Sequence, residues 1–447
     1  MKRKRYIVSA MILLMVWLTG CSAVGLDAQT LMQPPKTTGD KQEIYQVLER
    51  KTNSQLKLRY PKAGDYRSAI IMKDITGDGN EEAIAFYSSG ESDFTNVSII
   101  SEVDGVWTEI ASFQNPATQI DRICFGDLSG NGVMEFAVGW GNSTTGISEF
   151  HLYFYSDGAF QEIQMKESYN ELTVLELDSN GQSGIVVVKL GTSEHPAQAK
   201  IYSIVNSRIQ LLGVADLDSD VTRYNKITVA KVDDTHSAVI LDGAKSANAY
   251  HTEILYWDAD IAQLKNPLYR PDSKTTAYTS RSISIASQDI NGDSIIEIPI
   301  THIMPGVSMQ MSYNTSFFTN WHRYDINTGT LTNLVSTVVN SNDGYMFMIP
   351  DPWKDKVTTV WDESDRSLTF YEWLFPAVER AIGKKGEPLL IIQVMTEQKW
   401  ENMNQAEWYK LKQHENMIFA AQLPSEASPL SLTMEQVEAS FRLFVQE

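Results

Sequence analysis

The sequence predicts a mainly β protein, a β-propeller of about five four-stranded blades followed by a small α+β C-terminal domain. Two observations predict the propeller. A nine-residue acidic motif recurs, with its first positions at residues 74, 127, 176, 231 and 289. The apolar runs around each copy repeat as well, and a spacing of ~49 to 58 residues is typical of a propeller blade. The repeat ends by residue 337, and the change in composition there predicts the second domain.

The acidic motif is complete in three copies, at residues 74–82, 127–135 and 289–297. Positions 1, 3, 5 and 9 of each copy carry side-chain oxygens, and position 6 is glycine in two of the three. Alternate residues of a tight loop can turn their oxygens inward, and glycine lets the backbone double back. The spacing therefore suits a hard cation, for which calcium is the natural candidate.

Two incomplete copies lie between the complete ones. Residues 176–181 match positions 1 to 6, but Gly184 stands where the last carboxylate should be. Residues 231–234 keep the position of the motif in the repeat but not its pattern of side-chain oxygens. With these two copies the array has five units, which we expect to span residues 40–337.

Apolar runs predict four strands in each unit. One run precedes each loop, at residues 69–72, 123–125, 172–175, 227–230 and 283–286. A second run follows the loop, and the third and fourth flank a turn. These turns are predicted at residues 104–105, 157–158, 206–207, 258–259 and 327–329. Dipeptides such as Asp-Gly form hairpin turns because both residues tolerate a positive φ. Sheets of this kind can bury their faces against their neighbours in the array.

The first residues of the chain predict export. Residues 1–5 are basic and residues 6–17 are almost wholly apolar, which is typical of a signal peptide at 1–20 and too short for a transmembrane helix. The segment ends in Leu-Thr-Gly-Cys, which resembles a bacterial lipobox and implies cleavage before Cys21 with lipid on its sulfur. The alternative is an ordinary signal with a chance cysteine. We expect a lipid anchor at the extracytoplasmic face of the cell membrane, with residues 21–39 as a flexible tether.

Cysteine content and charge exclude some classes of function. Once Cys21 carries lipid, only Cys124 remains, so an internal disulfide is excluded. Cys124 lies in an apolar run, which favours a small buried side chain over a catalytic thiol. The net charge of −19 argues against nucleic acid as a partner.

Two segments outside the array have their own predicted structure. Residues 40–51 carry Ile44, Val47 and Leu48 at helical spacing and predict a short helix before the first unit. Residues 338–447 predict a separate α+β domain with helices at 376–383 and 434–445.

The repeat resembles a known class. An acidic loop of this pattern followed by an apolar strand is similar to the FG-GAP and VCBS repeats of integrin α-subunit propellers and of many bacterial surface proteins. The likeness covers roughly residues 60–337. It implies calcium ligands at Asp74, Thr76, Asp78 and Glu82, at Asp127, Ser129, Asn131 and Glu135, and at Asp289, Asn291, Asp293 and Glu297. Two features depart from the pattern: Ser294 replaces the glycine of position 6, and Gly184 and Lys231 should abolish binding in their units.

A metal-free loop is the alternative. In it, Asp side chains accept hydrogen bonds from nearby backbone amides, and the motif is a tight Asx turn. In either case the loops close hairpins, so a calcium ion here would be structural.

Function is expected on the connections between the second and third strands, at residues 88–96, 141–149, 191–198, 242–250 and 301–314. They differ among units and are rich in Gly, Ser and Thr, as a recognition rim should be, although solvated filler explains them equally well. The sequence therefore predicts a non-enzymatic lipoprotein that binds or scaffolds a protein or glycan ligand at the cell surface.

Two alternatives remain. The first is a surface carbohydrate hydrolase that uses carboxylates at the propeller funnel, for which Asp93, Glu149 and Glu253 lie in or beside the predicted rim. The second is an envelope-complex assembly lipoprotein that acts through its C-terminal domain. The sequence has neither the His-Glu-x-x-His motif nor the Gly-x-Ser-x-Gly motif.

Overall fold

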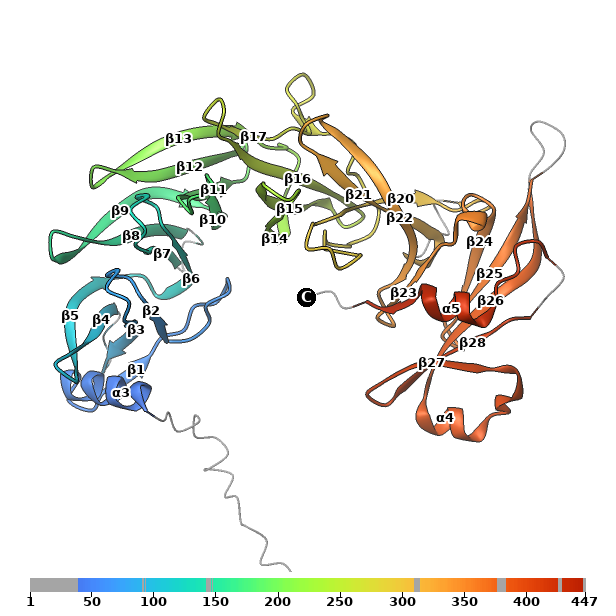
Figure 1. The fold of residues 1–447 in the computed structure, drawn as a ribbon, viewed down its shortest axis with the longest axis horizontal. Helices are drawn as coiled ribbons and strands as arrows, with labels where there is room; N and C mark the ends of the chain where they lie inside the picture. Colours follow the sequence, from blue (N-terminus) through green and yellow to red (C-terminus); the bar gives the residue numbers. More distant parts are fainter. Residues whose placement is uncertain are drawn as a thin grey trace, which may run out of the picture. The chain divides into compact units, whose positions relative to one another are not determined.

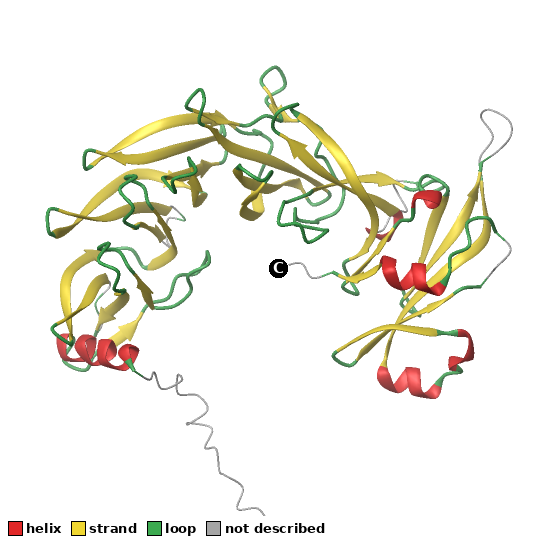
Figure 2. Cartoon of the chain, viewed as in Figure 1, coloured by secondary structure: helices red, strands yellow, loops and turns green. Residues whose placement is uncertain are grey.

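The computed structural model describes residues 39–90, 92, 94–141, 146, 148–308, 314–375, 383–424 and 428–444. Strands make up most of this part of the chain (Figure 2). It divides into two compact units, which are considered separately below. The predicted export signal, Cys21, and the tether except Gly39 lie outside the described residues.

The first unit comprises the described parts of residues 1–59, 68–73 and 81–116. It holds α3 (Asp40–Lys51), β1 (Leu56–Leu58), β2 (Ile70–Lys73), β3 (Glu82–Ser89), β4 (Thr95–Val103) and β5 (Val106–Asn115). The strands form one antiparallel sheet, in which β1 and β2 both pair with β3. Ile44 and Leu48 lie on one face of α3 and pack against the sheet residues Tyr87 and Trp107. The predicted leading helix is therefore confirmed.

The second unit, with residues 60–67, 74–80 and 117–447, contains three four-stranded antiparallel sheets in chain order (Figure 1). The first is β6 (Gln119–Gly126), β7 (Glu135–Gly141), β8 (Ser148–Ser156) and β9 (Ala159–Tyr169). The next is β10 (Glu171–Glu176), β11 (Ser183–Lys189), β12 (Gln198–Val205) and β13 (Arg208–Asp216). The last is β14 (Arg223–Lys231), β15 (Ser237–Ser246), β16 (Ala249–Asp258) and β17 (Gln263–Lys265). A two-stranded ribbon follows, β18 (Tyr269–Arg270) with β19 (Thr275–Thr276).

Strand composition follows position in these sheets. The apolar run of β11 is buried on both faces, whereas β9 and β13 alternate between more and less exposed residues. A central strand covered on both faces carries a continuous apolar run, and a half-covered strand alternates. The prediction of repeated four-stranded antiparallel sheets is confirmed for β6 to β17.

The hairpin turns are as predicted in three cases. Asp104 and Gly105 both have a positive φ, as do Asp157 with Gly158 and Asn206 with Ser207. This is the conformation of a type I′ turn, whose twist matches that of the flanking strands. The two-residue turn predicted at 258–259 is wrong, because β16 ends at Asp258 and β17 begins only at Gln263.

The next sheet takes strands from distant parts of the sequence. Its order is β20 (Ile298–Ile303), β21 (Phe317–Asp325), β22 (Thr330–Asn340), β23 (Tyr345–Met348) and β29 (Phe441–Leu443). The domain boundary expected after residue 337 falls inside β22. The predicted helix 434–445 is corrected: α5 (Met434–Ser440) ends at Ser440, and the chain continues as β29.

The strand predicted at residues 283–286 is wrong. Ile285 is buried against Trp321 of β21, as a strand residue would be, but residues 283–286 form no ladder; only the flanking residues form single bridges, Arg281 with Tyr250 and Gln288 with Glu297. The cause lies at its ends. Arg281 and Ser287 are both bonded to the buried carboxylate of Asp242 in β15, so the segment is held to the preceding sheet and cannot form a regular ladder with β20.

The C-terminal part forms a five-stranded antiparallel sheet in the order β24, β25, β26, β28, β27. Its elements are β24 (Val357–Asp362), β25 (Ser367–Leu374), β26 (Lys384–Thr396), α4 (Glu397–Asn402), β27 (Tyr409–His414) and β28 (Met417–Gln422). Short 3₁₀ turns occur at η2 (Asn314–Ser316), η3 (Asp351–Trp353) and η4 (Gln405–Glu407). The helix predicted at 376–383 lies outside the described residues except for Gly383. None of the described helices is long and apolar enough to span a membrane.

Candidate functional site

In two places, a β-bridge between two acidic loops joins consecutive sheets of the second unit. Position 1 of the second loop, Asp127, forms a parallel bridge with Gln182, which is position 7 of the third loop. The same relation joins Lys231 of the fourth loop to Ile295 of the fifth. In the first pair, Ser183 also donates its N–H to the carbonyl of Asp127 at 2.7 Å. The loops therefore join neighbouring sheets whether or not they hold metal.

The second loop brings its four predicted ligands together through hydrogen bonds. Asp127 accepts the N–H groups of Gly130 at 2.7 Å and Gly132 at 2.8 Å. Glu135 accepts the N–H of Leu128 at 2.6 Å and the hydroxyl of Ser129 at 2.6 Å. Asn131 accepts the N–H of Val133. The bonds to Asp127 and Asn131 are those of Asx turns. Oδ2 of Asp127 and Oε1 of Glu135 each accept one of these bonds and have a second lone pair with which they can accept further.

Burial raises the pKa of Glu135, against the opposing effect of the hydrogen bonds from Ser129 and Leu128. A raised carboxyl pKa in the folded state adds stability at acidic pH that is lost as the pH rises through that pKa. Without a cation, Glu135→Gln should therefore remove part of the wild-type decline in stability from pH ~4 to ~7. Urea unfolding of both proteins in chelator across this range measures the difference. Parallel stability profiles of the wild type and Glu135→Gln across this pH range would contradict a raised pKa of Glu135.

The residues of the first loop belong to two units: residues 74–80 to the second unit and residues 81–82 to the first. In the second unit, Asp74 accepts the N–H of Gly77 at 2.7 Å and that of Gly79 at 3.0 Å. Asp78 accepts the N–H of Asn80, which lowers the pKa of Asp78. Thr76 also forms a hydrogen bond or another polar or ring contact within the structure. In the first unit, Glu82 is fully buried and accepts the hydroxyl of Ser101 at 3.3 Å.

The fifth loop repeats the turn and adds a cation from the protein. Asp289 accepts the N–H groups of Gly292 and Ser294, and Asn291 donates to Asp293. Arg323 of β21 donates to both Asp293 and Glu297. Ser294, at position 6, has a φ of 69° and so adopts the left-handed conformation that glycine adopts at this position in the other two complete copies.

The loops differ in how well they fit a calcium ion. The second loop offers oxygen donors of the type that calcium prefers, two of them carboxylates. The fifth loop does not fit, because a guanidinium already contacts two of its three carboxylates. Within the described ranges, no group of three or more His, Cys, Asp or Glu residues is arranged to hold a metal ion.

Several cavities adjoin the connections between second and third strands. One of about 240 Å³ is lined by His195 and Gln198, which belong to the predicted rim segment 191–198. One of about 290 Å³ is lined by Asp242, Tyr250 and Arg281. The predicted loop 242–250 is itself wrong, because β15 and β16 continue through it to a turn at residues 247–248. A third cavity adjoins His302 in the predicted segment 301–314.

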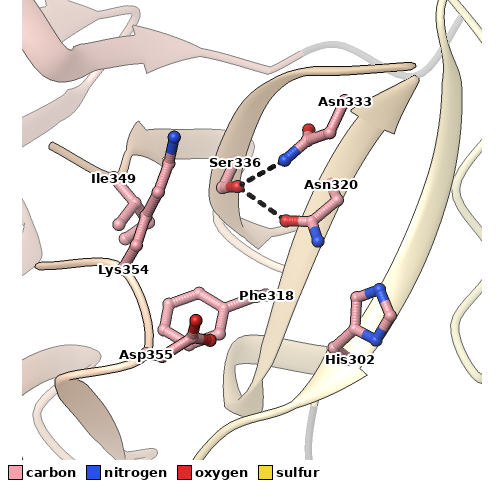
Figure 3. Close-up of a pocket in the computed structure, with 8 residues that line it drawn as sticks. All are labelled: His302, Phe318, Asn320, Asn333, Ser336, Ile349, Lys354 and Asp355. Carbon is pink, nitrogen blue, oxygen red and sulfur yellow. Dashed lines mark hydrogen bonds between the residues drawn. The ribbon is translucent and has the colours of Figure 1, made fainter. Parts of the chain in front are cut away.

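The third cavity is drawn in Figure 3 and has a volume of about 110 Å³. Its lining residues are His302 of β20, Phe318 and Asn320 of β21, Asn333 and Ser336 of β22, Ile349, Lys354 and Asp355. Ser336 donates to the carbonyl oxygen of Asn320 at 2.6 Å, which leaves the Asn320 amide NH2 to donate elsewhere. Asn333 in turn donates to Ser336 at 3.4 Å. These bonds hold the two amides in fixed positions at one wall (Figure 3).

The same cavity offers both donors and acceptors beside apolar surface. Lys354 and Asp355 supply opposite charges, and the ring of Phe318 supplies an apolar wall. Burial lowers the pKa of nearby His322, and the proximity of His302 lowers it further. The lowered pKa favours the neutral form of His322, and the ring nitrogens of His302 add further polar groups to the cavity. This set of groups suits a neutral ligand rich in hydroxyls.

Of the three acids considered for catalysis, two lie within the described residues. Glu253 is fully buried and accepts hydrogen bonds from Tyr224 at 2.9 Å and Asn266 at 2.9 Å. Glu149 is exposed on β8, and Asp93 lies outside the described residues. Burial raises the pKa of Cys124 to about 12, so its thiol stays protonated and is a poor nucleophile.

The cavity residues His302, Asn320, Asn333 and Ser336 were not singled out by the sequence analysis, which named only the segment 301–314. Asn320 and Ser336 belong to neighbouring strands 16 positions apart in the sequence. Strand alternation places both residues on one face of the sheet, but only the register of β21 against β22 brings them together. The sequence signal that could have found them is the run of polar residues within two otherwise apolar strands.

No protein-family model matches the sequence, and no curated protein matches it. Among solved structures, an unknown-function protein from Dyadobacter fermentans is similar at 10% identity and TM-score 0.32, over 83% of this chain and 98% of that one. The Dos1 propeller is similar at 12% identity and TM-score 0.31, over 81% and 68%. A protein from Lactobacillus plantarum is similar at 9% identity and TM-score 0.29, over 72% and 85%. Scores at this level carry no argument about fold or function, which rest on the strand pairing and the cavities.

Proposed function

We propose that this chain is a non-enzymatic lipoprotein of the extracytoplasmic face of the cell membrane, anchored through Cys21. Its four-stranded sheets form a β-propeller of the FG-GAP and VCBS type, and the propeller binds a ligand at the cell surface. Calcium in the first and second loops adds stability. The ligand class that the cavity beside Asn320 favours is a glycan, whose hydroxyls donate and accept at once while its C–H face packs on Phe318.

One observation carries the choice of binding over catalysis. Five cavities in the described residues are each lined by a single carboxylate: Asp355, Glu135, Asp242, Glu43 or Glu167. Glycoside cleavage by acid and base needs two carboxyl groups ~5 to 9.5 Å apart across one pocket. The cavities supply hydrogen bonding without this pair, so we place the hydrolase second.

The assembly alternative would use the C-terminal sheet. Leu374 and Phe375 are exposed at the end of β25, and Tyr409 is exposed at the start of β27. Substituting Phe375 by Ser should leave glycan binding unchanged if the glycan proposal is correct. Loss of an envelope complex in that variant, with glycan binding absent throughout, would favour assembly instead.

The proposal is tested with the full chain on an array of immobilised oligosaccharides. Asn320→Ala should weaken retention of the bound glycan about 3- to 10-fold, because one hydrogen bond contributes ~0.5–1.5 kcal/mol. Asn327→Ala is the matched control, since Asn327 lies in the turn after β21 and does not line the cavity. Absence of any bound saccharide would overturn the ligand class. Cys21→Ser should move the protein from the membrane fraction to the soluble one, and its retention in the membrane would overturn the anchor.

Calcium dependence is tested at Asp78. Asp78→Ala should lower the melting temperature in calcium buffer and change it little in chelator, because the hydrogen bond that Asp78 accepts from the N–H of Asn80 is exposed and water can replace it. Thermal unfolding monitored by circular dichroism in both buffers measures this. Equal losses in the two buffers would mean that the carboxylate acts as a turn former alone.

A further inference from the structure

Arg323 lies between two carboxylates of the fifth acidic loop. One of its terminal nitrogens is 2.5 Å from a carboxylate oxygen of Asp293 and 2.6 Å from one of Glu297. The Glu297 side chain is fully buried, whereas that of Asp293 is 40% exposed. The guanidinium therefore lies between two of the four side chains predicted to bind calcium in this loop.

The strand register places Arg323 at this point. Ile298 of β20 pairs with His322 of β21, so the next step of the antiparallel ladder sets Glu297 opposite Arg323. The same step in the other sheets sets Phe154 opposite Glu135 and Ser101 opposite Glu82. The residue opposite the last carboxylate in the ladder is thus a cation in the fifth loop and uncharged in the first and second.

The charges of the fifth loop require such a partner. Asp289, Asp293 and Glu297 bring three negative charges into one turn, and an unpaired carboxylate that is fully buried is strongly destabilising. Hydrogen bonding from Arg323 lowers the pKa of Asp293. Burial acts to lower the pKa of Arg323, but its bonds to Glu297 and Asp293 outweigh burial and raise it. Arg323 also acts to lower the pKa of Glu297, but burial of Glu297 outweighs this and raises its pKa.

We propose that Arg323 supplies to the fifth loop the positive charge that calcium supplies to the first and second, so that the fifth loop folds without metal. The comparison with those two loops rests on the calcium part of the proposed function. Calcium and a guanidinium repel each other and compete for the same oxygens of Asp293 and Glu297. Removal of Arg323 should leave a loop with three carboxylates, a set of ligands that suits calcium.

The experiment uses the purified full chain as wild type, Arg323→Gln and Arg323→Lys. Arg323→Gln should bind one more calcium ion per chain in titration calorimetry, and its melting temperature should fall in chelator and recover with calcium. Arg323→Lys keeps the charge and should behave as wild type. In the wild-type background, Asp293→Asn should give the same loss with and without calcium.

The inference is overturned if Arg323→Gln gains no calcium and melts equally in both buffers, or if Asp293→Asn loses stability only in calcium buffer. If instead the wild type binds no calcium while Arg323→Gln binds one ion, the inference about the fifth loop stands and the calcium part of the proposed function fails.

Discussion

Asp242→Ala should destabilise the folded protein by about 3–5 kcal/mol, because it leaves Arg281 as an unpaired buried charge. The two side chains are 2.7 Å apart and both are at least nine-tenths buried. Asp242 also accepts the hydroxyl of Thr252 at 2.6 Å and the N–H of Ser287 at 2.8 Å. The substitution therefore removes the attachment of the segment 281–287 to β15 together with the charge. Urea unfolding of the full chain measures the loss.

A double-mutant cycle separates the ion pair from its surroundings. Arg281→Met alone should also destabilise, since it leaves the Asp242 carboxylate buried without its cation. The double variant Asp242→Ala with Arg281→Met should lose less than the sum of the two single losses, because no buried charge remains. Additive losses, or a loss under about 1 kcal/mol for Asp242→Ala, would show that the pair does not hold this segment.

Trp353→Ala should cost about 3–5 kcal/mol, the range for deleting a large aromatic side chain from a core. Trp353 is fully buried, and its ring centroid lies 5.9 Å from that of Phe347 in β23 and 5.4 Å from that of Phe370 in β25. Its indole N–H donates to the carbonyl of Leu430 at 2.7 Å. One side chain thus connects two sheets and the segment before α5.

Trp353→Phe is the control for the hydrogen bond. Phenylalanine keeps most of the aromatic contact but leaves the Leu430 carbonyl without its donor, which costs ~1–3 kcal/mol when the group is buried. Chemical unfolding should therefore rank the wild type above Trp353→Phe and Trp353→Phe above Trp353→Ala. Equal stability of the wild type and Trp353→Ala would contradict the packing described for this core.

Local chemistry made much of the fold predictable. The turn dipeptides at Asp157 and Asn206 have the positive φ that their composition favours, and the apolar runs around them are strands. The acidic loops form the expected tight turns, because Asp at position 1 can accept the N–H groups of the glycines at positions 4 and 6. Patterns that depend on neighbours in sequence were therefore the reliable ones.

Contacts between distant residues explain the errors. The apolar pattern of residues 283–286 fits a strand, but the carboxylate of Asp242, some 40 positions earlier, holds both ends of the segment elsewhere. The rim loop predicted at residues 242–250 is instead the end of a hairpin, because β15 and β16 stay paired up to the turn at residues 247–248. Arg323 was also missed, because its position beside Asp293 follows from the register of β20 and β21 and not from the spacing of the motif.

Glycan binding without cleavage separates the proposed function from the hydrolase alternative. The most direct measurement is mass spectrometry of an oligosaccharide that the array selects, after incubation with the full chain and elution. We expect an oligosaccharide of unchanged length, retained by the wild type and by the Asn327→Ala control and weakly by Asn320→Ala. Shortened fragments with new reducing ends, formed by the wild type, would contradict it.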